Sequence, residues 1–230
     1  MSEVPELIKM PELMKREAPS PPLFRKAVET IPKQRDRDLI KLLYLTAARV
    51  SEVITQASPY DIKHKKSMPY GRELRWQLDE FEGEKVLILT LATAKRRWIT
   101  MKAGQAEEHL VPKLIALPVN PKYEPWTFDL LKRIAKHKTL SFNTSRFTAL
   151  RVVRKNLSPI DPKIHTHSLR HYRISHLMEY YNFDPYDVIA YTGWTYKSGL
   201  QKMSMPSGFM DTYAHLSWKK YFPKLLKVAA

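Results

Sequence analysis

The segment HTHSLRHYRISH, residues 165–176, holds the densest group of chemically active side chains in the sequence. If a helix begins near His167, then His167, Arg170 and His171 lie three and four positions apart and project from one face. A guanidinium fork matches two phosphate oxygens, and an imidazole exchanges a proton near neutral pH. This face predicts an anion site. Zinc binding by the two histidines is one alternative, but no third ligand is obvious. The simplest alternative is that these residues are solvated or cap the helix.

A second arginine, Arg49, lies in the apolar stretch LLYLTAARVSEV, residues 42–53. A charge in such surroundings needs a partner. One candidate is Glu52, three positions further on. The other is a substrate phosphate, in which case Glu52 would orient the arginine. The sequence leaves both alternatives open.

Three consecutive cations, Lys95, Arg96 and Arg97, follow the strand-like KVLILTLAT, residues 85–93. At the tip of a hairpin such a run faces solvent or contacts nucleic acid. The two arginines would also lower the proton affinity of Lys95, so that it could act as a general acid. Lys102, on the opposite side of the hairpin, is the alternative lysine.

Near the end of the sequence, DTYAHLSW (211–218) contains Tyr213 and His215. A tyrosine is usually a core or interface residue. A phenolate that attacks phosphorus would instead form a covalent intermediate that conserves the bond energy and needs no metal.

The elements that must position these residues are mainly helical. Apolar residues recur with helical spacing from 35 to about 57, and this pattern predicts one buried helix that contains Arg49. Four later segments also have helical patterns: 126–137, 145–157, 169–181 and 185–194. Short β-branched and aromatic runs separated by turns occupy 74–112. The sequence therefore predicts an α+β fold, mainly α with a small antiparallel β-sheet.

Composition limits the function. The 230 residues carry a formal net charge of +16, which predicts a polyanionic partner such as nucleic acid. The absence of cysteine excludes disulfides, cysteine-based zinc sites, iron–sulfur clusters and thiol nucleophiles. The sequence contains neither GxGxxG nor GxxxxGK[ST], which argues against ATP and dinucleotide chemistry. The longest apolar run, residues 86–92, is too short to span a membrane, and no secretory signal is visible. We expect an intracellular protein without a membrane partner.

Three regions are expected along the chain. Residues 1–34 contain six of the 17 prolines and predict an arm or linker. Residues 35–217 would form the folded domain. The tail, 218–230, has apolar residues among lysines and would pack either on its own domain or on a neighbouring protomer.

Taken in order, these segments resemble the motifs of the tyrosine recombinase (phage integrase) family. LLYLTAARVSEV is similar to the TxxRxSE of Box I, THSLRH to HxLRH, YTGW to the LGH or LGW element, and DTYAHL to TxxYxH. Lys95 lies between the first two motifs, where the family has its hairpin lysine. The resemblance covers residues 35–218. It implies the fold of a tyrosine recombinase catalytic domain.

The resemblance also implies an activity: site-specific recombination or integration of double-stranded DNA through a 3′-phosphotyrosyl intermediate, without a metal or other cofactor. Such enzymes of mobile elements work as tetramers of protomers on DNA, here in the cytoplasm or nucleoid of a prokaryotic or viral host. Arg49 and Arg170 would bind the non-bridging oxygens of the scissile phosphate. His167 would transfer a proton with the nucleophile Tyr213, and Lys95 would protonate the leaving 5′ oxygen.

The resemblance places Trp194 among the catalytic positions as well. It stands where most members have a histidine, and its indole can donate a hydrogen bond to phosphate but cannot transfer a proton. Glu52 and His171 would support the site, and the hairpin residues Arg96 and Arg97 would contact DNA.

Two departures keep alternatives open. Ala47 replaces the glycine that is common after the threonine of Box I. Nineteen positions separate Trp194 from Tyr213, about twice the usual spacing, so Tyr196 is a rival nucleophile. A type IB topoisomerase-like DNA relaxer and a catalytically impaired DNA-binding module are the alternative functions.

Overall fold

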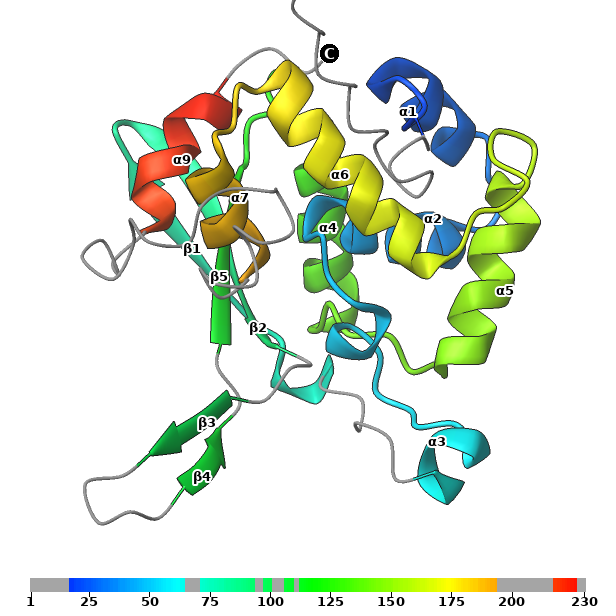
Figure 1. Ribbon diagram of the computed structural model, residues 1–230. Coiled ribbons are helices and arrows are strands. Elements are labelled where there is room, and N and C mark those ends of the chain that lie inside the picture. The colour runs from blue at the N-terminus through cyan, green and yellow to red at the C-terminus, as the bar shows by residue number, and fades with distance from the viewer. Residues whose placement is uncertain are drawn as a thin grey trace, which may run out of the picture.

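The computed structural model in Figure 1 describes residues 17–64, 71–93, 97–100, 106–109, 112–193 and 217–226. This part of the chain is mixed α and β, as the sequence predicts. Its α-helices are α1 (Pro21–Glu29), α2 (Gln34–Leu45), α3 (Pro59–Lys63), α4 (Pro125–His137), α5 (Arg146–Leu157), α6 (Thr166–Tyr180), α7 (Pro185–Thr192) and α9 (Trp218–Leu225). Two short 3₁₀ helices are η2 (Val50–Glu52) and η3 (Gly71–Glu73). Within the ranges given, no helix is both long and apolar enough to cross a membrane.

The strands form two antiparallel sheets. The larger sheet has the order β1–β2–β5, with β1 (Arg75–Phe81), β2 (Glu84–Ala92) and β5 (Pro112–Pro118). Between β2 and β5 the chain extends into a separate two-stranded hairpin, β3 (Arg97–Thr100) and β4 (Ala106–His109). The central strand β2 is the apolar run VLILTLA, which is buried because neighbours pair with both of its edges. The predicted antiparallel sheet is confirmed, and its third strand lies beyond the segment in which we expected it.

The four helices expected in the C-terminal half are confirmed to within three residues at each end. The clearest boundaries belong to α7. The Asp184 side chain accepts hydrogen bonds from two backbone amides of the first turn, Pro185 occupies the first helical position, and Gly193 ends the helix with φ +67°. These are the residue types that such positions favour.

The helix predicted for 35–57 is much shorter than expected. It ends at Leu45, and Thr46 caps it. Ala47 then adopts φ +44°, in the left-handed region, so the helix cannot continue. Arg49 therefore lies on a turn beyond the helix and not within it. The apolar residues Val53 and Ile54, which follow this turn and η2, are buried in the core.

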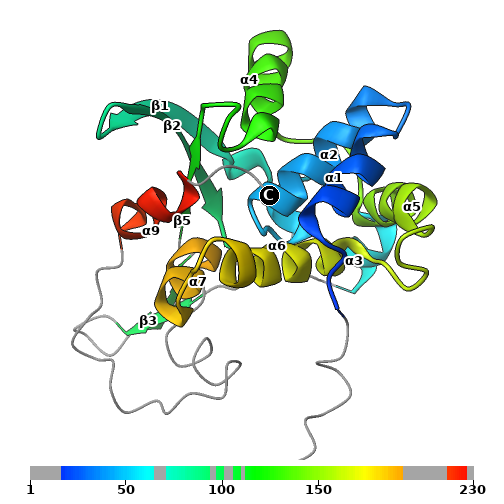
Figure 2. The same cartoon turned by 90° about the horizontal axis from the view of Figure 1, so that it is seen from above.

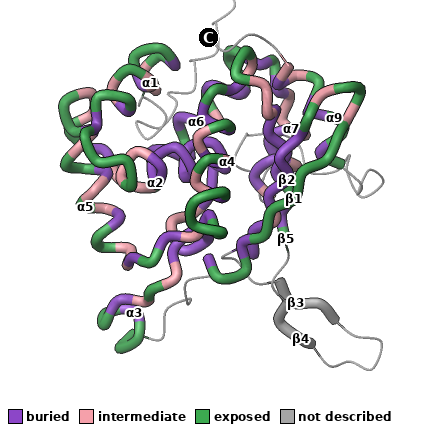
Figure 3. The backbone as a smooth tube through the Cα atoms, turned by 180° about the vertical axis from the view of Figure 1, so that it is seen from behind, coloured by how far each residue is buried: buried purple, intermediate pink, exposed green. Residues whose placement is uncertain are grey.

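Helix α2 forms the centre of the helical layer. It contacts α1, α4, α5 and α6, and Figure 2 shows it between α4 on one side and α6 on the other. Every residue from Asp38 to Leu45 is buried, which is the pattern of a helix surrounded by protein. Viewed from behind, the buried positions gather along α2, α6 and the sheet, and α4 and α5 present exposed outer faces (Figure 3).

Helix α1 lies in the stretch for which the prolines predicted an arm. Pro21 and Pro22 occupy the first turn, where a helix needs no backbone N–H, so the helix forms in spite of them. Phe24 is fully buried against a group of aromatic rings, including Tyr44 at 4.8 Å. Residues 21–29 are therefore part of the core and not a linker.

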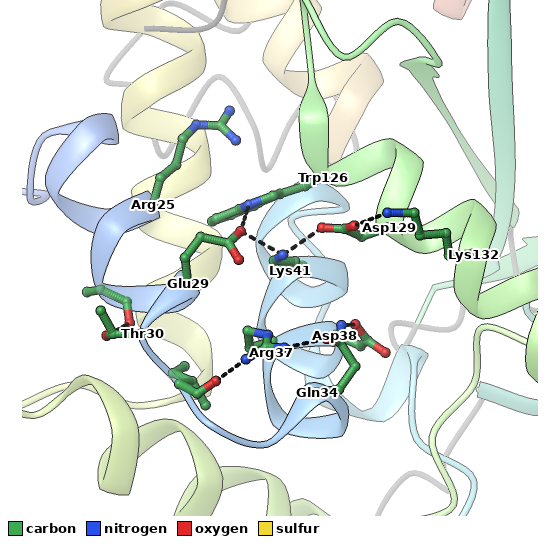
Figure 4. Close-up of polar contacts among 12 residues, drawn as sticks. Arg25, Glu29, Thr30, Gln34, Arg37, Asp38, Lys41, Trp126, Asp129 and Lys132 are labelled. Carbon is green, nitrogen blue, oxygen red and sulfur yellow. Dashed lines mark hydrogen bonds and ion pairs between the residues drawn. The ribbon is translucent and has the colours of Figure 1, made fainter.

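An ion-pair network around the buried Lys41 attaches α1 to α2 and α4 (Figure 4). The Lys41 ammonium lies 2.7 Å from carboxylate oxygens of both Glu29 and Asp129. The Trp126 indole N–H donates to the same Glu29 carboxylate at 2.6 Å. Because Lys41 is buried, these partners are what make its charge tolerable there.

The described part of the tail, helix α9, packs on its own chain against β5 and α7. Tyr221, Phe222 and Leu225 are buried. The Tyr221 hydroxyl accepts a hydrogen bond from the Ala116 amide of β5 at 3.1 Å. Of the two placements expected for the tail, this is the one on its own domain.

Candidate active site

Arg49 and Glu52 form the first pair of the site. The Arg49 amide donates to Glu52 Oε2 at 2.9 Å, and its Nη1 lies 3.4 Å from Glu52 Oε1. These contacts fold the turn that leads into η2. The Glu52 side chain is 1% exposed, whereas the Arg49 side chain is 27% exposed. Glu52 is thus the protein partner of Arg49, and the Arg49 side chain remains partly exposed.

Arg170 enters the same region from α6. It is buried, and its Nη1 donates to the Ala47 carbonyl oxygen on the turn after α2. Its Nη2 donates to the Thr192 carbonyl oxygen at the end of α7, at 3.3 Å. One side chain therefore joins three segments that are distant in sequence.

The two arginines act on a common carboxylate. Burial lowers the pKa of Arg170 to about 10, with Glu52 raising it and Arg49 lowering it further. The structure thus brings Arg49, Glu52 and Arg170 into one cluster, as an anion site requires. Bringing two guanidinium groups together without a bound anion is unfavourable, and Glu52 offsets part of that repulsion.

Lys113, on β5, belongs to the cluster although the sequence analysis did not select it. It is 3% exposed, its Nζ lies 3.3 Å from Glu52 Oε2, and it donates to the Thr46 carbonyl oxygen at 3.2 Å. Burial lowers its pKa to about 8; Glu52 opposes this effect, and Arg170 and Arg49 add to it. A signal was present, because Lys113 interrupts the apolar run LVPKLIALP.

Gly193, at the end of α7, fixes the stem of Lys113. A Cβ atom at this glycine would lie 2.8 Å from Lys113 Cβ and 3.2 Å from its Cδ. Only glycine leaves this space and also adopts φ +67° without strain. The glycine of the YTGW motif therefore has a packing role beside the cluster.

His167 and His171 lie on the first turns of α6, as predicted, with ring centroids 4.6 Å apart and ring planes perpendicular. Partial burial lowers the pKa of His167 to about 4, and the charges of His171, Arg170, His165 and Arg49 lower it further. His167 is therefore neutral at pH 7 and can accept a proton. In the described part of the chain no three His, Asp or Glu side chains are grouped as a metal ion would need, so the zinc alternative gains no third ligand there.

The other predicted site residues lie outside the described residues: Lys95, Arg96, Trp194 and Tyr213, with the alternatives Lys102 and Tyr196. Arg97 belongs to β3, of which the structure describes the backbone. The described half of the site comprises Arg49, Glu52, Lys113, His167 and Arg170.

The charges of these described site residues determine which ligands they can bind. Three cations, Arg49, Lys113 and Arg170, interact with the single carboxylate of Glu52. The excess positive charge favours an anion with several acceptor oxygens. Arg49, with its partly exposed side chain, would be the first contact of such an anion.

Comparisons with family models, with curated proteins and with solved structures found no match to this chain.

Proposed function

We propose that this protein is a tyrosine recombinase that cuts and rejoins double-stranded DNA through a covalent bond between Tyr213 and a DNA phosphate. The observation that supports the proposal most directly is the cluster of Arg49, Arg170 and Glu52. These residues come from two motifs far apart in the sequence, and the resemblance assigns both motifs to one phosphate.

In the proposed reaction, the Tyr213 oxygen attacks the scissile phosphorus and the bond to the 5′ oxygen breaks. The tyrosine proton passes to His167, and Lys95 gives a proton to the leaving oxygen. Rejoining is the reverse, in which a 5′ hydroxyl attacks the phosphotyrosine. No oxidant, reductant or nucleotide is consumed, because one phosphodiester bond replaces another.

The two arginines would contribute most in the transition state. Negative charge grows on the equatorial oxygens of the phosphorus during attack, so donors already in place stabilise this state more than the ground state. Loss of one such donor typically costs about 10²–10³ in rate.

DNA would approach the side of the molecule from which α3 and the β3–β4 hairpin project (Figures 1 and 3). Arg96 and Arg97, at the start of that hairpin, are the proposed contacts to the DNA backbone. A chain with a net charge of +16 attracts DNA strongly, and this attraction weakens with salt.

The test is a covalent adduct with DNA. The protein is incubated in EDTA with nicked DNA that contains its target site, found by selection from a randomised duplex pool. We expect a protein–DNA adduct in the wild type and none in Tyr213→Phe, with Tyr196→Phe as the matched control that keeps the adduct.

Three other results would contradict the proposal in different ways. An adduct retained by Tyr213→Phe and lost in Tyr196→Phe would move the nucleophile to Tyr196. Relaxation of supercoiled DNA by a monomer, without a partner site, would favour the topoisomerase alternative. DNA binding without any adduct would favour an impaired binding module.

A further inference from the structure

A cavity of about 380 Å³ lies between the start of β1 and the end of α4, and none of the cluster residues described above lines it. This volume is within the range of about 300–1,000 Å³ that is usual for small-molecule sites. Its wall includes three cations, an indole and three hydroxyl groups: Arg72, Arg75, Lys138, Trp76, Thr55, Thr139 and Ser141. The wall is therefore suited to a ligand that has both an anionic group and a flat ring.

The cations of this cavity have weak structural roles. Arg75 donates to the carbonyl oxygens of Arg72 and Leu74, and its Nη2 lies 3.8 Å from a carboxylate oxygen of Glu73. Both partners of that ion pair are more than half exposed, and an exposed pair of this kind stabilises a fold little. Arg72 and Lys138 are also exposed. Their charges remain accessible to a ligand.

Trp76 is 40% exposed although it stands in a strand. The rest of the wall combines the apolar side chain of Leu74 with cations and hydroxyl groups. The exposed part of Trp76 is available to a ligand. A base stacks on such a face whatever its identity. Trp76 therefore supplies the flat surface of the cavity.

Lys138 occupies a position that usually belongs to glycine. It follows α4 with φ +58°, and its amide donates to the Ile134 carbonyl oxygen at 2.8 Å. Glycine is the common residue at this left-handed position because a side chain adds strain there. A lysine does benefit from the helix C-terminus, and in this fold it also places an ammonium group at the wall of the cavity.

We propose that this cavity binds one nucleotide of single-stranded DNA, with the base stacked on Trp76 and the phosphate held by Arg72 and Lys138. Duplex DNA keeps its bases stacked on each other, so only an unpaired base can use the indole. The source of the strand rests on the proposed function, because strand cleavage leaves an end that can separate from its complement.

The position of the cavity fits a strand that leaves the active site. Arg75 pairs with Thr90 near the end of β2, so the cavity lies at the end of the sheet from which the β3–β4 hairpin continues. Thr55 comes three residues after Glu52, and its amide donates to the Phe142 carbonyl oxygen at 3.0 Å. The same short segment therefore belongs to both sites.

The test measures binding of the full-length Tyr213→Phe protein to a fluorescent (dT)₈ oligonucleotide by anisotropy. We expect Trp76→Ala to weaken binding about 10-fold and Trp76→Phe, which keeps a ring, less than 3-fold. Phe128→Ala is the matched control, because Phe128 is an aromatic residue of similar exposure, 44%, outside the cavity.

A second pair of variants tests the phosphate contact. Arg72→Ala and Lys138→Ala should each weaken (dT)₈ binding and reduce the salt slope by about 0.7, the value for one phosphate of a single strand. Lys132→Ala is the control, because Lys132 is an exposed lysine of α4, the helix that Lys138 follows.

The outcomes separate the ligands. For the wild type, an oligonucleotide without bases should bind about 10-fold more weakly than (dT)₈. For Trp76→Ala, the two oligonucleotides should bind with equal affinity. Equal binding of the two oligonucleotides by the wild type, or equal loss of duplex and (dT)₈ affinity in Trp76→Ala, would overturn the proposal. Inorganic phosphate and dTMP would be compared as competitors of (dT)₈. If phosphate displaces (dT)₈ fully at the same concentration as dTMP, the proposal is also overturned, because binding of phosphate alone would then explain the site. If (dT)₈ binding follows these expectations and no DNA adduct forms in the wild type, the proposed function fails and the cavity assignment stands.

Discussion

Arg170 donates a hydrogen bond to the carbonyl oxygen of Ala47, 123 positions earlier in the chain. Ala47 holds φ +44°, which turns this carbonyl out of the path of α2, and its own amide donates to the Tyr44 carbonyl oxygen at 3.0 Å. The Box I motif that this stretch resembles commonly has a glycine at this position. The backbone of Ala47 is left-handed, a conformation that glycine adopts without strain, and Arg170 binds its carbonyl oxygen.

Ala47→Gly should therefore not destabilise the protein. A left-handed conformation costs a non-glycine residue about 1–2 kcal/mol, and glycine gives back about 0.5–1 kcal/mol through the entropy of the unfolded chain. We expect the free energy of unfolding to rise by about 0.5–1 kcal/mol in urea titrations. Ala48→Gly is the control, since Ala48 is equally buried without a positive φ, and it should lose about 1 kcal/mol. Equal losses in both variants would contradict this account.

Lys113→Met should damage the site through Glu52. Removal of one partner of a buried ion pair typically costs about 3–5 kcal/mol, because the other charge stays buried without it. Here Arg49 still pairs with Glu52, so we expect about 2–3 kcal/mol and at least a 10-fold slower rate of adduct formation. Lys113→Arg should recover part of the rate, which a purely structural loss would not predict. Lys85→Met, an exposed lysine of β2, is the control.

The same lysine gives a pH dependence of known sign. Its pKa in the folded protein, about 8, is lower than the ordinary lysine pKa of 10.5, so the unfolded chain binds more protons between these values. The contribution of Lys113 to stability should rise as the pH increases from 8 to 10, and Lys113→Met should remove that rise. A Lys113→Met protein whose stability still follows the wild-type pH curve would refute the assignment.

His167 should change its protonation when an anion binds. Burial lowers its pKa to about 4, and electrostatic interactions with His171, Arg170, His165 and Arg49 add to this effect. A phosphate beside Arg49 and Arg170 would cancel much of the repulsion from the two arginines. We expect NMR titration of the His167 ring to give a pKa higher by at least about 1 unit in phosphate than in chloride at equal ionic strength. In Arg49→Ala the shift caused by phosphate should become smaller. An unchanged pKa in phosphate would show that the anion binds elsewhere.

His176 links the stability of α1 to pH. Its Nε2 faces the Pro19 carbonyl oxygen at 2.8 Å and therefore carries the proton, and its Nδ1 accepts from the Tyr44 hydroxyl at 2.7 Å. Burial lowers the pKa of His176 to about 4, although the Pro19 contact opposes this effect.

The unfolded chain therefore binds more protons than the folded one between pH 6.5 and 4, and stability is lost as the pH falls through this window. The loss should approach about 1 kcal/mol per pH unit. In urea titrations, the free energy of unfolding of the wild type should exceed that of His176→Gln by more at pH 7 than at pH 5. The difference in free energy of unfolding between the wild type and His137→Gln, a control at an exposed histidine, should be the same at both pH values.

The helices of the C-terminal half could be predicted because their ends carry local signals, such as Asp184, Pro185 and Gly193 around α7. The end of α2 could not be predicted. It depends on the Ala47 turn and on Arg170, a contact that no local pattern contains. For α1, the prolines that suggested an arm are compatible with a first helical turn, and burial of Phe24 decides in favour of the helix.

The candidate site was predicted in part for the same reason. Arg49, Glu52, His167 and Arg170 could be selected because each lies in a short motif with a recognisable residue pattern. Lys113 could not, since its role depends on β5 passing beside Thr46 and Gly193, which is a property of the folded sheet.

Gly71 sets the spacing between the cluster and the cavity. A Cβ atom there would lie 2.4 Å from the Ile54 carbonyl oxygen, so the backbone of η3 lies directly against the segment that follows Glu52. The two proposed anion sites therefore share a closely packed wall and cannot move apart independently. A DNA strand bound at both sites would be cut at a constant number of nucleotides from the base that stacks on Trp76.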